Sequence, residues 1–302
     1  MLRGDMRFLL FCMAFIWAAC SVKGGTPETD FLWADVPDGV SLVKYIGSEE
    51  DIVIPETAGG KPVTEIAPWA FWNCLRAKKV KVGSRVTRIR QRAFWFCTEL
   101  ISLELPASVS ETGLAAFDEC VQLQSFTLDP ENQKYACRDG VLFSRDMKKL
   151  IRYPEGKRGS YTVPDGVRVI GEGAFHGCAF LERVTLPEGL EEIEDRGFYS
   201  CCNLKELILP KSLKVIGDNA FTDCSRVERL VIPARVVRIG EDAFSWTNSL
   251  KGIWFEGDEP EAGGRQLGHF VPNYPVVYHR KDAKGWPGPG WRGMKTQIYE
   301  QE

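Results

Sequence analysis

Residues 167–189 read VRVIGEGAFHGCAFLERVTLPEG, a stretch of 23 residues that contains every element of a repeat recurring along the chain. The pattern is V-x-x-I-x-x-x-A-F-x-x-C-x-x-L-x-x-L-x-L-P, in which V, I and L stand for aliphatic positions. A unit of this length cannot bury its own Phe and aliphatic side chains, so copies must stack into a solenoid. The in-register phenylalanines are 23 residues apart except for one interval of 58: Phe71, Phe94, Phe117, Phe175, Phe198, Phe221 and Phe244.

The apolar spacing changes within each unit, and the change predicts the local structure. The L-x-L element has period two, which indicates a short strand with one face inward, and Pro ends it because Pro cannot donate to a ladder. The A-F-x-x-C segment has neither strand nor long-helix spacing, and it predicts one tight helical turn that places Phe in the interior. We therefore expect a mainly β solenoid with short helical turns.

Cysteine follows Phe by three residues in six copies, at positions 74, 97, 120, 178, 201 and 224, and Thr247 takes its place in the last. Cysteines one rung apart have parallel side-chain directions, whereas a disulfide needs its Cβ atoms about 3.8 Å apart. We expect buried free thiols that hydrogen-bond the neighbouring turn. Cys137 and Cys202 lie outside this column, and a disulfide involving either stays open; the adjacent Cys201-Cys202 pair does not suit zinc.

The 58-residue interval predicts an insertion at about residues 129–163. Asp139-Gly140 precedes the apolar run 141–143, and the six residues 144–149 separate it from the run 150–153. This arrangement is typical of a β-hairpin, after which residues 161–164 restore the register. At the ends, residues 52–55 resemble an incomplete first rung and residues 276–278 a last one. The predicted divisions are 21–62 for an N-terminal cap, 63–256 for the solenoid and 257–302 for a C-terminal cap.

The N-terminus predicts export. Arg3 and Arg7 precede an apolar run from residue 8 to residue 19, which is too short to span a bilayer but suits a signal-peptide core. Ala18-Ala19-Cys20 then resembles a lipoprotein cleavage site, although Trp17 departs from it. Residues 1–20 are therefore a signal peptide or lipoprotein signal; lipid attachment at Cys20 and ordinary cleavage near residues 20–25 both stay open.

Composition excludes several classes of protein. Apolar residues make up 44% of the 302 residues and charged residues 26%, which argues against disorder and against a polytopic membrane protein. The net charge of -3 does not supply the basic face that nucleic-acid binding requires. We expect no nucleic-acid partner, and a membrane contact only through the lipid anchor.

The A-F-x-x-C, I-G and L-x-L-P elements resemble the BspA-type leucine-rich repeats of bacterial surface proteins over about residues 31–300. Ile170-Gly171, Ile216-Gly217 and Ile239-Gly240 match the I-G element. The resemblance implies a curved solenoid with a parallel sheet on its concave face, in a protein that is secreted or displayed at the cell surface. It also implies adhesion or matrix binding, with no catalytic residue. Thr112, where Ile is expected, departs from the pattern in the third rung.

Nothing in the sequence indicates catalysis or a cofactor. His176, His269 and His279 lack the spacing of a metal site or a catalytic triad, and we expect them on the surface or in caps. The chain contains no G-x-S-x-G, H-E-x-x-H or phosphate-loop motif. We expect a protein that is not an enzyme and holds no metal.

Residues between the buried strand positions are expected on the concave face, and three in consecutive rungs are apolar: Ile208, Val231 and Trp254. We hypothesise that they contact a protein partner, in the extracellular matrix or on another cell surface. Arg183, Glu206 and Arg229 would form a border of mixed charge. Two alternatives stay open: these residues only stabilise the ladder, or the C-terminal cap folds over them. The polar positions of the same column are Lys81, Glu104, Thr127 and Thr185.

A second aromatic cluster lies in the first two rungs, where Trp69, Trp72, Trp95 and Phe96 flank the core phenylalanines. Exposed tryptophans can stack on sugar rings, so a carbohydrate-binding surface that uses Trp72 and Trp95 is the alternative function. Packing of Phe31 and Trp33 onto this cluster as an N-terminal cap would be the structural explanation.

Overall fold

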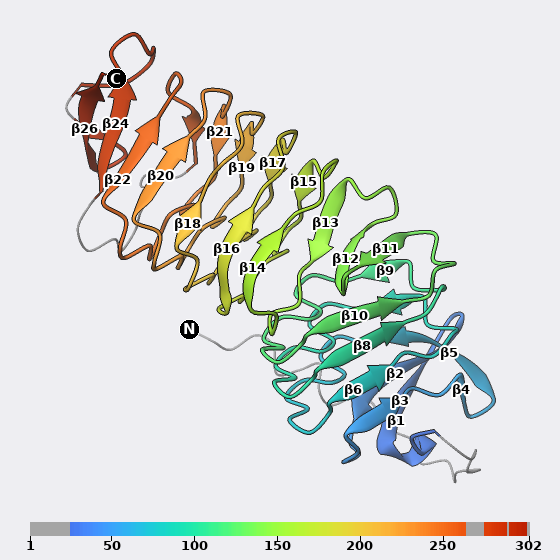
Figure 1. The fold of residues 1–302 in the computed structure, drawn as a ribbon. Helices are drawn as coiled ribbons and strands as arrows, with labels where there is room; N and C mark the ends of the chain where they lie inside the picture. The colour runs from blue at the N-terminus through green and yellow to red at the C-terminus, as the bar shows by residue number, and fades with distance from the viewer. Residues whose placement is uncertain (1–24, 264–274, 289, 301–302) are drawn as a thin grey trace.

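Each repeat forms one rung of an elongated solenoid in the computed structural model, which describes residues 25–263, 275–288 and 290–300 (Figure 1). The rungs follow one another in chain order from the N-terminal to the C-terminal half. Two strand segments per rung pair in parallel with the same segments of the neighbouring rungs. The predicted solenoid built on parallel sheets is confirmed.

The L-x-L segments form one face of the solenoid, which we call the L-x-L face. Residues pair at the period of the repeat, so that Leu230 lies opposite Ile253 and Val231 opposite Trp254. The strands fall into three consecutive sheets: β3 (Asp51–Val53), β6 (Lys79–Lys81), β8 (Ser102–Leu105) and β10 (Ser125–Leu128); β14 (Gly159–Thr162), β16 (Leu181–Thr185) and β18 (Glu206–Leu207); and β20 (Arg229–Ile232), β22 (Gly252–Phe255), β24 (Val276–Arg280) and β26 (Met294–Tyr299).

The V-x-x-I segments form a second parallel ladder that we did not predict from the sequence. Most of its strands are two residues long, too short for a period-two pattern to show. In all of them except β9, which ends in Thr112, an aliphatic residue points inward, as Ile193 and Ile216 do. The strands are β5 (Lys61–Ile66), β7 (Arg88–Ile89) and β9 (Glu111–Thr112), then β13 (Lys149–Arg152), β15 (Val169–Ile170), β17 (Glu192–Ile193), β19 (Val215–Ile216), β21 (Arg238–Ile239) and β23 (Glu261–Ala262).

The A-F-x-x-C segment forms tight turns that are linked from rung to rung by a third ladder. The N–H of Phe94 donates to the carbonyl of Ala116 at 2.8 Å, and the N–H of Phe96 donates to that of Asp118 at 3.1 Å. Arg92 and Phe96 have φ of 53° and 63°, so left-handed residues interrupt the helical turn that the spacing suggested. Left-handed backbone costs about 1–2 kcal/mol per residue, and the hydrogen bonds between rungs offset this strain. In the described residues the one helical element is the 3-10 helix η1 (Glu28–Asp30).

One aromatic ring per rung fills the interior and lies against the next. The Phe175 and Phe198 rings have centroids 4.7 Å apart and planes inclined by 6°, and Phe198 and Phe221 are 5.5 Å apart. Two tyrosines continue the same column. The Tyr45 ring stacks on Phe71 with centroids 5.5 Å apart, and the Tyr153 ring lies at a tilt to Phe175 with centroids 5.0 Å apart. The 58-residue interval therefore contains one further rung, in which Tyr replaces Phe.

The cysteine column supplies hydrogen bonds between rungs. Cys201 Sγ donates to the carbonyl of Phe175 at 3.1 Å, and Cys224 Sγ donates to that of Phe198 at 3.3 Å. Thr247 Oγ1 makes the same bond to Phe221 at 3.1 Å. A hydroxyl thus replaces the thiol where the sequence has Thr, which shows that the position requires a small buried donor. All eight described cysteines, including Cys137 and Cys202, are free, as expected for the column.

The solenoid is interrupted between Phe117 and Tyr153, a level that we call the joint. The L-x-L ladder stops at β10 and resumes at β14, and the V-x-x-I ladder stops at β9 and resumes at β13. The core divides here into two clusters, and the strands of the two halves are tilted differently in Figure 1. The predicted hairpin is formed by β12 (Val141–Ser144) and β13, and β11 (Tyr135–Arg138) pairs with β12 as a third antiparallel strand.

Two polar residues of the joint, Asn132 and Thr112, are paired where the ladders stop. Asn132 is fully buried, and its amide donates to the carbonyls of Pro106 and Val109 at 3.1 and 2.8 Å. Thr112, the departure from the repeat, contacts the Tyr135 hydroxyl through its side chain at 3.2 Å and through its N–H at 3.1 Å. The irregular residue therefore ends the N-terminal ladder by bonding to the insertion.

Both ends are covered by strands and aromatic rings. At the N-terminus β1 (Phe31–Val36) and β2 (Gly39–Tyr45) form an antiparallel pair, β4 (Thr57–Ala58) pairs with β5, and the Phe31 ring lies 5.2 Å from Tyr45. At the C-terminus β25 (Gly290–Trp291) pairs with β26. Trp291 is buried there, 5.2 Å from Phe255. The exposed ends of the core are thus closed at both termini.

Truncation of a stacked ring should destabilise the whole half that contains it. We expect Phe198→Ala to cost about 3–5 kcal/mol, because the cavity removes contacts to both neighbouring rungs. Urea unfolding followed by circular dichroism measures the change. Phe96→Ala is the control, since Phe96 is exposed and should cost far less; equal losses would show that the stacked column is not the core.

The cysteine column can be tested by isosteric replacement. We expect Cys224→Thr to keep the free energy of unfolding near the original value and Cys224→Val to lower it by about 1 kcal/mol, because only Thr retains a donor for the Phe198 carbonyl.

Burial also raises the pKa of the Cys224 thiol well above its usual range, so little reactive thiolate forms. Iodoacetamide at pH 8 should therefore alkylate it only after unfolding; rapid labelling of the folded protein would contradict this.

Candidate functional site

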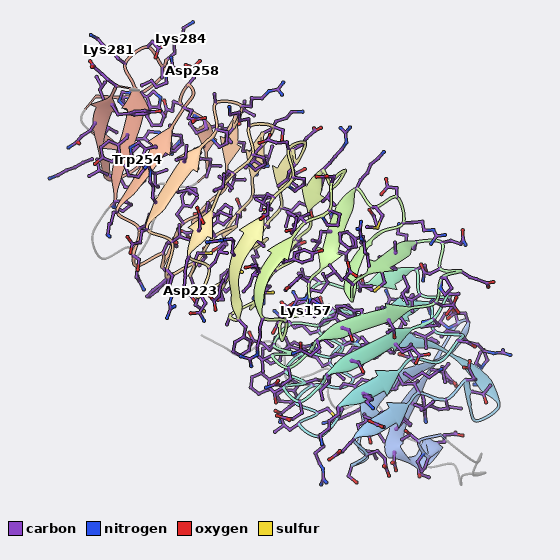
Figure 2. All side chains as sticks on the ribbon, viewed as in Figure 1. Lys157, Asp223, Trp254, Asp258, Lys281 and Lys284 are labelled. Carbon is purple, nitrogen blue, oxygen red and sulfur yellow. The ribbon has the colours of Figure 1, made fainter. Side chains whose placement is uncertain are left out.

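An apolar column lies on the L-x-L face of the C-terminal half, and Trp254 is labelled in Figure 2. Ile208, directly after β18, has 69% of its surface exposed, whereas Val231 and Trp254 are half-buried. The column continues beyond the predicted residues, because Trp254 pairs with Tyr278 of β24 and their rings stack 4.6 Å apart at 8°. We call Ile208, Val231, Trp254 and Tyr278 the apolar column.

The orientation of the Trp254 ring depends on a neighbouring glycine and an arginine. A Cβ at Gly252 would lie 2.7 Å from the indole and 2.9 Å from the Tyr278 ring, so only glycine leaves room for this stack. The Arg229 guanidinium lies over the indole, 4.4 Å from its ring centroid. This cation–π contact and the ring stack hold the side chain in one place without burying it fully.

The charged border is present but weakly coupled. Arg183 and Glu206 approach to 3.4 Å with more than half of each side chain exposed, so their pairing contributes little stability. In the N-terminal half the same strand position carries polar residues, among them Lys81 and Glu104, which are paired at 2.7 Å, and Thr127. The face is therefore apolar only toward the C-terminus. The described part of the C-terminal cap extends the sheet through β24 and β26, and it leaves Ile208 exposed.

The N-terminal tryptophans form a separate cluster. Trp69 contacts Trp72 and Trp95 edge to face, with centroids 6.4 and 5.4 Å apart, and Trp72 keeps 50% of its surface exposed. Phe31 packs on Trp33 and Tyr45 at the end of the core column. Phe31 therefore contacts the end of the core column, and the Trp72 side chain stays half exposed.

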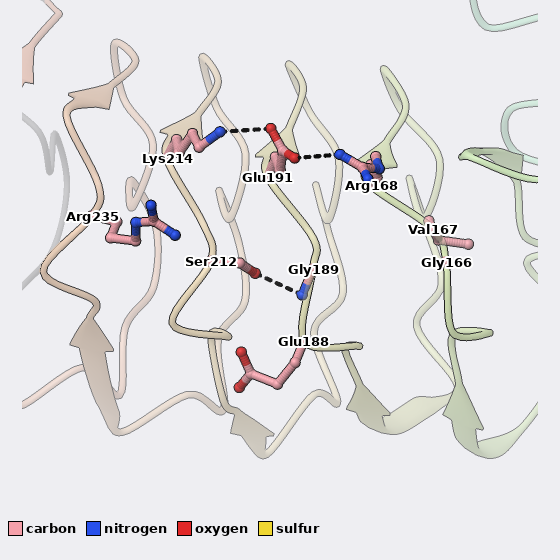
Figure 3. A pocket seen from close by; sticks show the side chains of 9 residues that line it. All are labelled: Gly166, Val167, Arg168, Glu188, Gly189, Glu191, Ser212, Lys214 and Arg235. Atoms are coloured by element: carbon pink, nitrogen blue, oxygen red, sulfur yellow. Dashed lines mark hydrogen bonds and ion pairs between the residues drawn. The ribbon is translucent and has the colours of Figure 1, made fainter.

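A shallow groove of about 370 Å³ runs across four rungs between the two ladders (Figure 3). Glu191 bridges its walls by accepting bonds from Arg168 at 2.8 Å and Lys214 at 2.7 Å. The Lys214 bond lowers the pKa of Glu191, so its carboxylate stays ionised and is a poor general acid at neutral pH. The groove is lined by Gly166, Val167, Arg168, Glu188, Gly189, Glu191, Ser212, Lys214 and Arg235.

A buried polar cluster lies at the joint, and we call its members Asp118, Arg152, Glu155 and His176 the joint cluster. Arg152 donates to Glu155 and contacts Asp118 at 2.8 Å, and it also donates to the carbonyls of Phe117 and Gly173. Burial raises the pKa of Glu155 to about 8 despite Arg152, and burial lowers the pKa of His176. Polar groups so deeply placed need partners, because each unpaired one costs about 1–3 kcal/mol.

Comparison with known proteins assigns the repeat. A family model described as the BspA type leucine-rich repeat region matches residues 46–138 and 156–260 in six copies. The chain belongs to this family. The two matched segments lie on either side of the inserted hairpin, so the break between them coincides with the joint.

Solved structures give the same fold at low identity. A leucine-rich repeat protein from Eubacterium ventriosum is similar over 84% of this BspA-type chain and 96% of its own, with 15% identity and a TM-score of 0.50. A leucine-rich cell surface protein from Faecalibacterium prausnitzii covers 80% and 89%, with 20% identity and a TM-score of 0.46. The pneumococcal vaccine antigen PcpA covers 94% of both chains, with 19% identity and a TM-score of 0.49. A search of curated proteins found no significant match.

The joint cluster was missed from the sequence of this BspA-type chain because its residues are far apart and follow no motif spacing. A signal did exist: Asp118 and His176 both follow a core Phe directly, and Arg152 stands where most repeats have Ala. The expectation that His176 lies on the surface or in a cap was wrong, because its side chain is 15% exposed within the cluster. His279 stacks on Trp286 in the C-terminal cap, as expected, and His269 lies outside the described residues.

The predicted export signal and Cys20 also lie outside the described residues. Among those that are described, no helix is long and apolar enough to cross a membrane.

Proposed function

We propose that this BspA-type protein is an exported, non-enzymatic interaction or adhesion module that binds a protein partner through its apolar column. The observation that carries the proposal is the stack of Trp254 and Tyr278 beside exposed Ile208, on a sheet face that is otherwise polar. Aromatic and Arg side chains dominate the energy of protein interfaces, and Arg229 lies against this stack. The partner is a protein of the extracellular matrix or of another cell surface.

The rigidity of the solenoid supports this mechanism. Trp254 is held by Tyr278 and Arg229 before any partner arrives, so little side-chain entropy is lost on binding. The partner would cover the apolar column. The Arg183–Glu206 border would remain solvated and would favour partners whose surface charges are complementary to it.

The absence of an enzymatic role is likewise proposed. The groove carboxylate Glu191 is held ionised by two cations, and the joint cluster is largely buried. Neither arrangement places a nucleophile beside an accessible base in the described part of the chain.

Attachment to the cell envelope through Cys20, or release after cleavage near residues 20–25, completes the proposal. Incorporation of labelled palmitate that disappears in Cys20→Ala would establish the anchor, and its absence in a bacterial host would exclude it.

The interaction surface can be tested with immobilised matrix proteins and intact cells. We expect the double variant Trp254→Ala, Val231→Ser to lose binding by at least tenfold, because it removes two anchors of the apolar column. Surface plasmon resonance on matrix-coated chips measures the affinity, and the melting temperature shows that the fold is kept.

Thr127→Ala is the matched control, since Thr127 occupies the same strand position in the N-terminal half and should bind like the original protein. Equal binding by all three proteins would reject the apolar column, and no binding by the original protein to either surface would reject matrix or cell adhesion.

Carbohydrate binding by the N-terminal tryptophans is the second candidate, favoured by the half-exposed ring of Trp72. If it holds, Trp72→Ala with Trp95→Ala should abolish signals on a glycan array, because the sugar loses its stacking surface. Trp246→Ala, which changes an exposed tryptophan of the other half, should leave those signals unchanged. An array on which the original protein gives no signal rules this candidate out.

A further inference from the structure

Arg152 and Glu155 of the joint cluster are the two charged residues that are buried in the described part of the chain. The Glu155 side chain is 1% exposed, and the Asp118 and His176 side chains are 13% and 15% exposed. Each comes from a different rung: Asp118 follows the Phe117 ring, Glu155 follows Tyr153, and His176 follows Phe175. Their juxtaposition therefore requires all three rungs at the joint to be in register.

Three atoms in this cluster are buried without a hydrogen-bond partner, namely Arg152 Nε, Glu155 Oε2 and His176 Nδ1, and the last two can ligate a metal ion. His176 Nδ1 lies 3.4 Å from Asp118 Oδ2, close enough for an ion pair but without hydrogen-bond geometry. Buried polar atoms are nearly always satisfied in folded proteins, so unpaired atoms facing one another point to a bound group.

Arg152 accounts for the remaining carboxylate atoms. Its guanidinium contacts Asp118 through Oδ1 at 2.8 Å and Glu155 through Oε1, and the N–H of Glu119 also donates to Oε1 at 3.0 Å. One oxygen of each carboxylate is thereby fixed and the other is left available. Metal-ligating carboxylates are typically held by such outer hydrogen bonds.

We propose that Asp118, Glu155 and His176 bind a divalent transition-metal ion of the zinc class, which clasps the two halves of the solenoid together. Single donor atoms of the three residues all lie within 4.8 Å of one another. Two ligands of a tetrahedral zinc ion are about 3.4 Å apart, given bonds of about 2.1 Å. The His176–Asp118 pair already has this separation, so Glu155 alone has to move inward.

The donor set and the local charge select the class of ion. One imidazole with two carboxylates suits zinc and neighbouring transition metals, whereas calcium and magnesium prefer oxygen ligands throughout. Metal binding requires both carboxylates ionised, and Arg152 then balances one of them, which leaves one net negative charge for a divalent cation. The partly exposed edges of Asp118 and His176 give the ion a route in and leave a fourth position for water.

Gly177 provides independent evidence that space is kept for this carboxylate. A Cβ there would lie 3.0–3.2 Å from the Glu155 carboxyl group. Other rungs place Asn73, Ser200 or Trp246 at the same turn position with the same left-handed backbone, so the backbone alone does not require glycine. Glycine is needed at residue 177 because any larger side chain would displace the Glu155 carboxyl group.

Direct titration of the tag-free mature protein, stripped with a chelator, tests the site. We expect calorimetry with ZnCl2 to show one equivalent bound and the melting temperature to rise with zinc, because the ion binds only the folded joint. Co²⁺ should give the visible absorption of a four-coordinate site. Asp118→Asn and His176→Gln should each lower zinc affinity at least tenfold, and circular dichroism in chelator checks that they fold.

His279→Gln is the matched histidine control and should bind zinc like the original protein. Failure of the original protein to bind a stoichiometric ion overturns the proposal. Undiminished binding by the Asp118 and His176 variants, or loss of binding in His279→Gln, places the ion elsewhere and also overturns it. If a variant does not fold, the Co²⁺ spectrum of the original protein still tests the proposal. A spectrum that is not that of a four-coordinate ion with nitrogen and oxygen ligands contradicts the proposed site.

Discussion

Contact between one aromatic ring and the next sets the geometry of each half of the chain. Within a half, the ring of each rung has to meet the ring of the following rung, and this requirement fixes the 23-residue period, with Phe175 and Phe198 nearly parallel. The turn that carries the ring adopts left-handed backbone at non-glycine residues such as Arg92, a conformation kept because its N–H groups bond to the next rung. The strand pairs, the turn hydrogen bonds and the thiol hydrogen bonds all join residues of neighbouring rungs, and they therefore keep the rings in register.

The same requirement explains which parts of the fold were visible in the sequence. Phe, Cys and the L-x-L-P element recur at buried positions, where the residue type is dictated by packing, so the solenoid and its free thiols could be predicted. The V-x-x-I ladder could not, because two-residue strands such as Glu192–Ile193 leave no alternation. Tyr153 was not recognised as a member of the ring column, because the insertion displaces it from the 23-residue spacing.

The candidate sites were predictable to different degrees. Ile208, Val231 and Trp254 occupy a position that is solvent-facing in every rung, so their apolar character stood out against Lys81 or Glu104. The sequence placed Tyr278 in the last rung but not in the apolar column. The residues between β22 and β24 do not follow the repeat, so the sequence does not show that Tyr278 pairs with Trp254. The joint cluster depends on long-range contacts among Asp118, Arg152 and His176, which no local pattern reports.

The joint has a consequence for how the chain folds. The N-terminal core is completed by Leu142, whereas the C-terminal core begins with Val141. The first half can therefore collapse around its own rings while the second half is still being synthesised. Folding then proceeds as two sequential events, and the first half presents a ready template on which the next rung is laid.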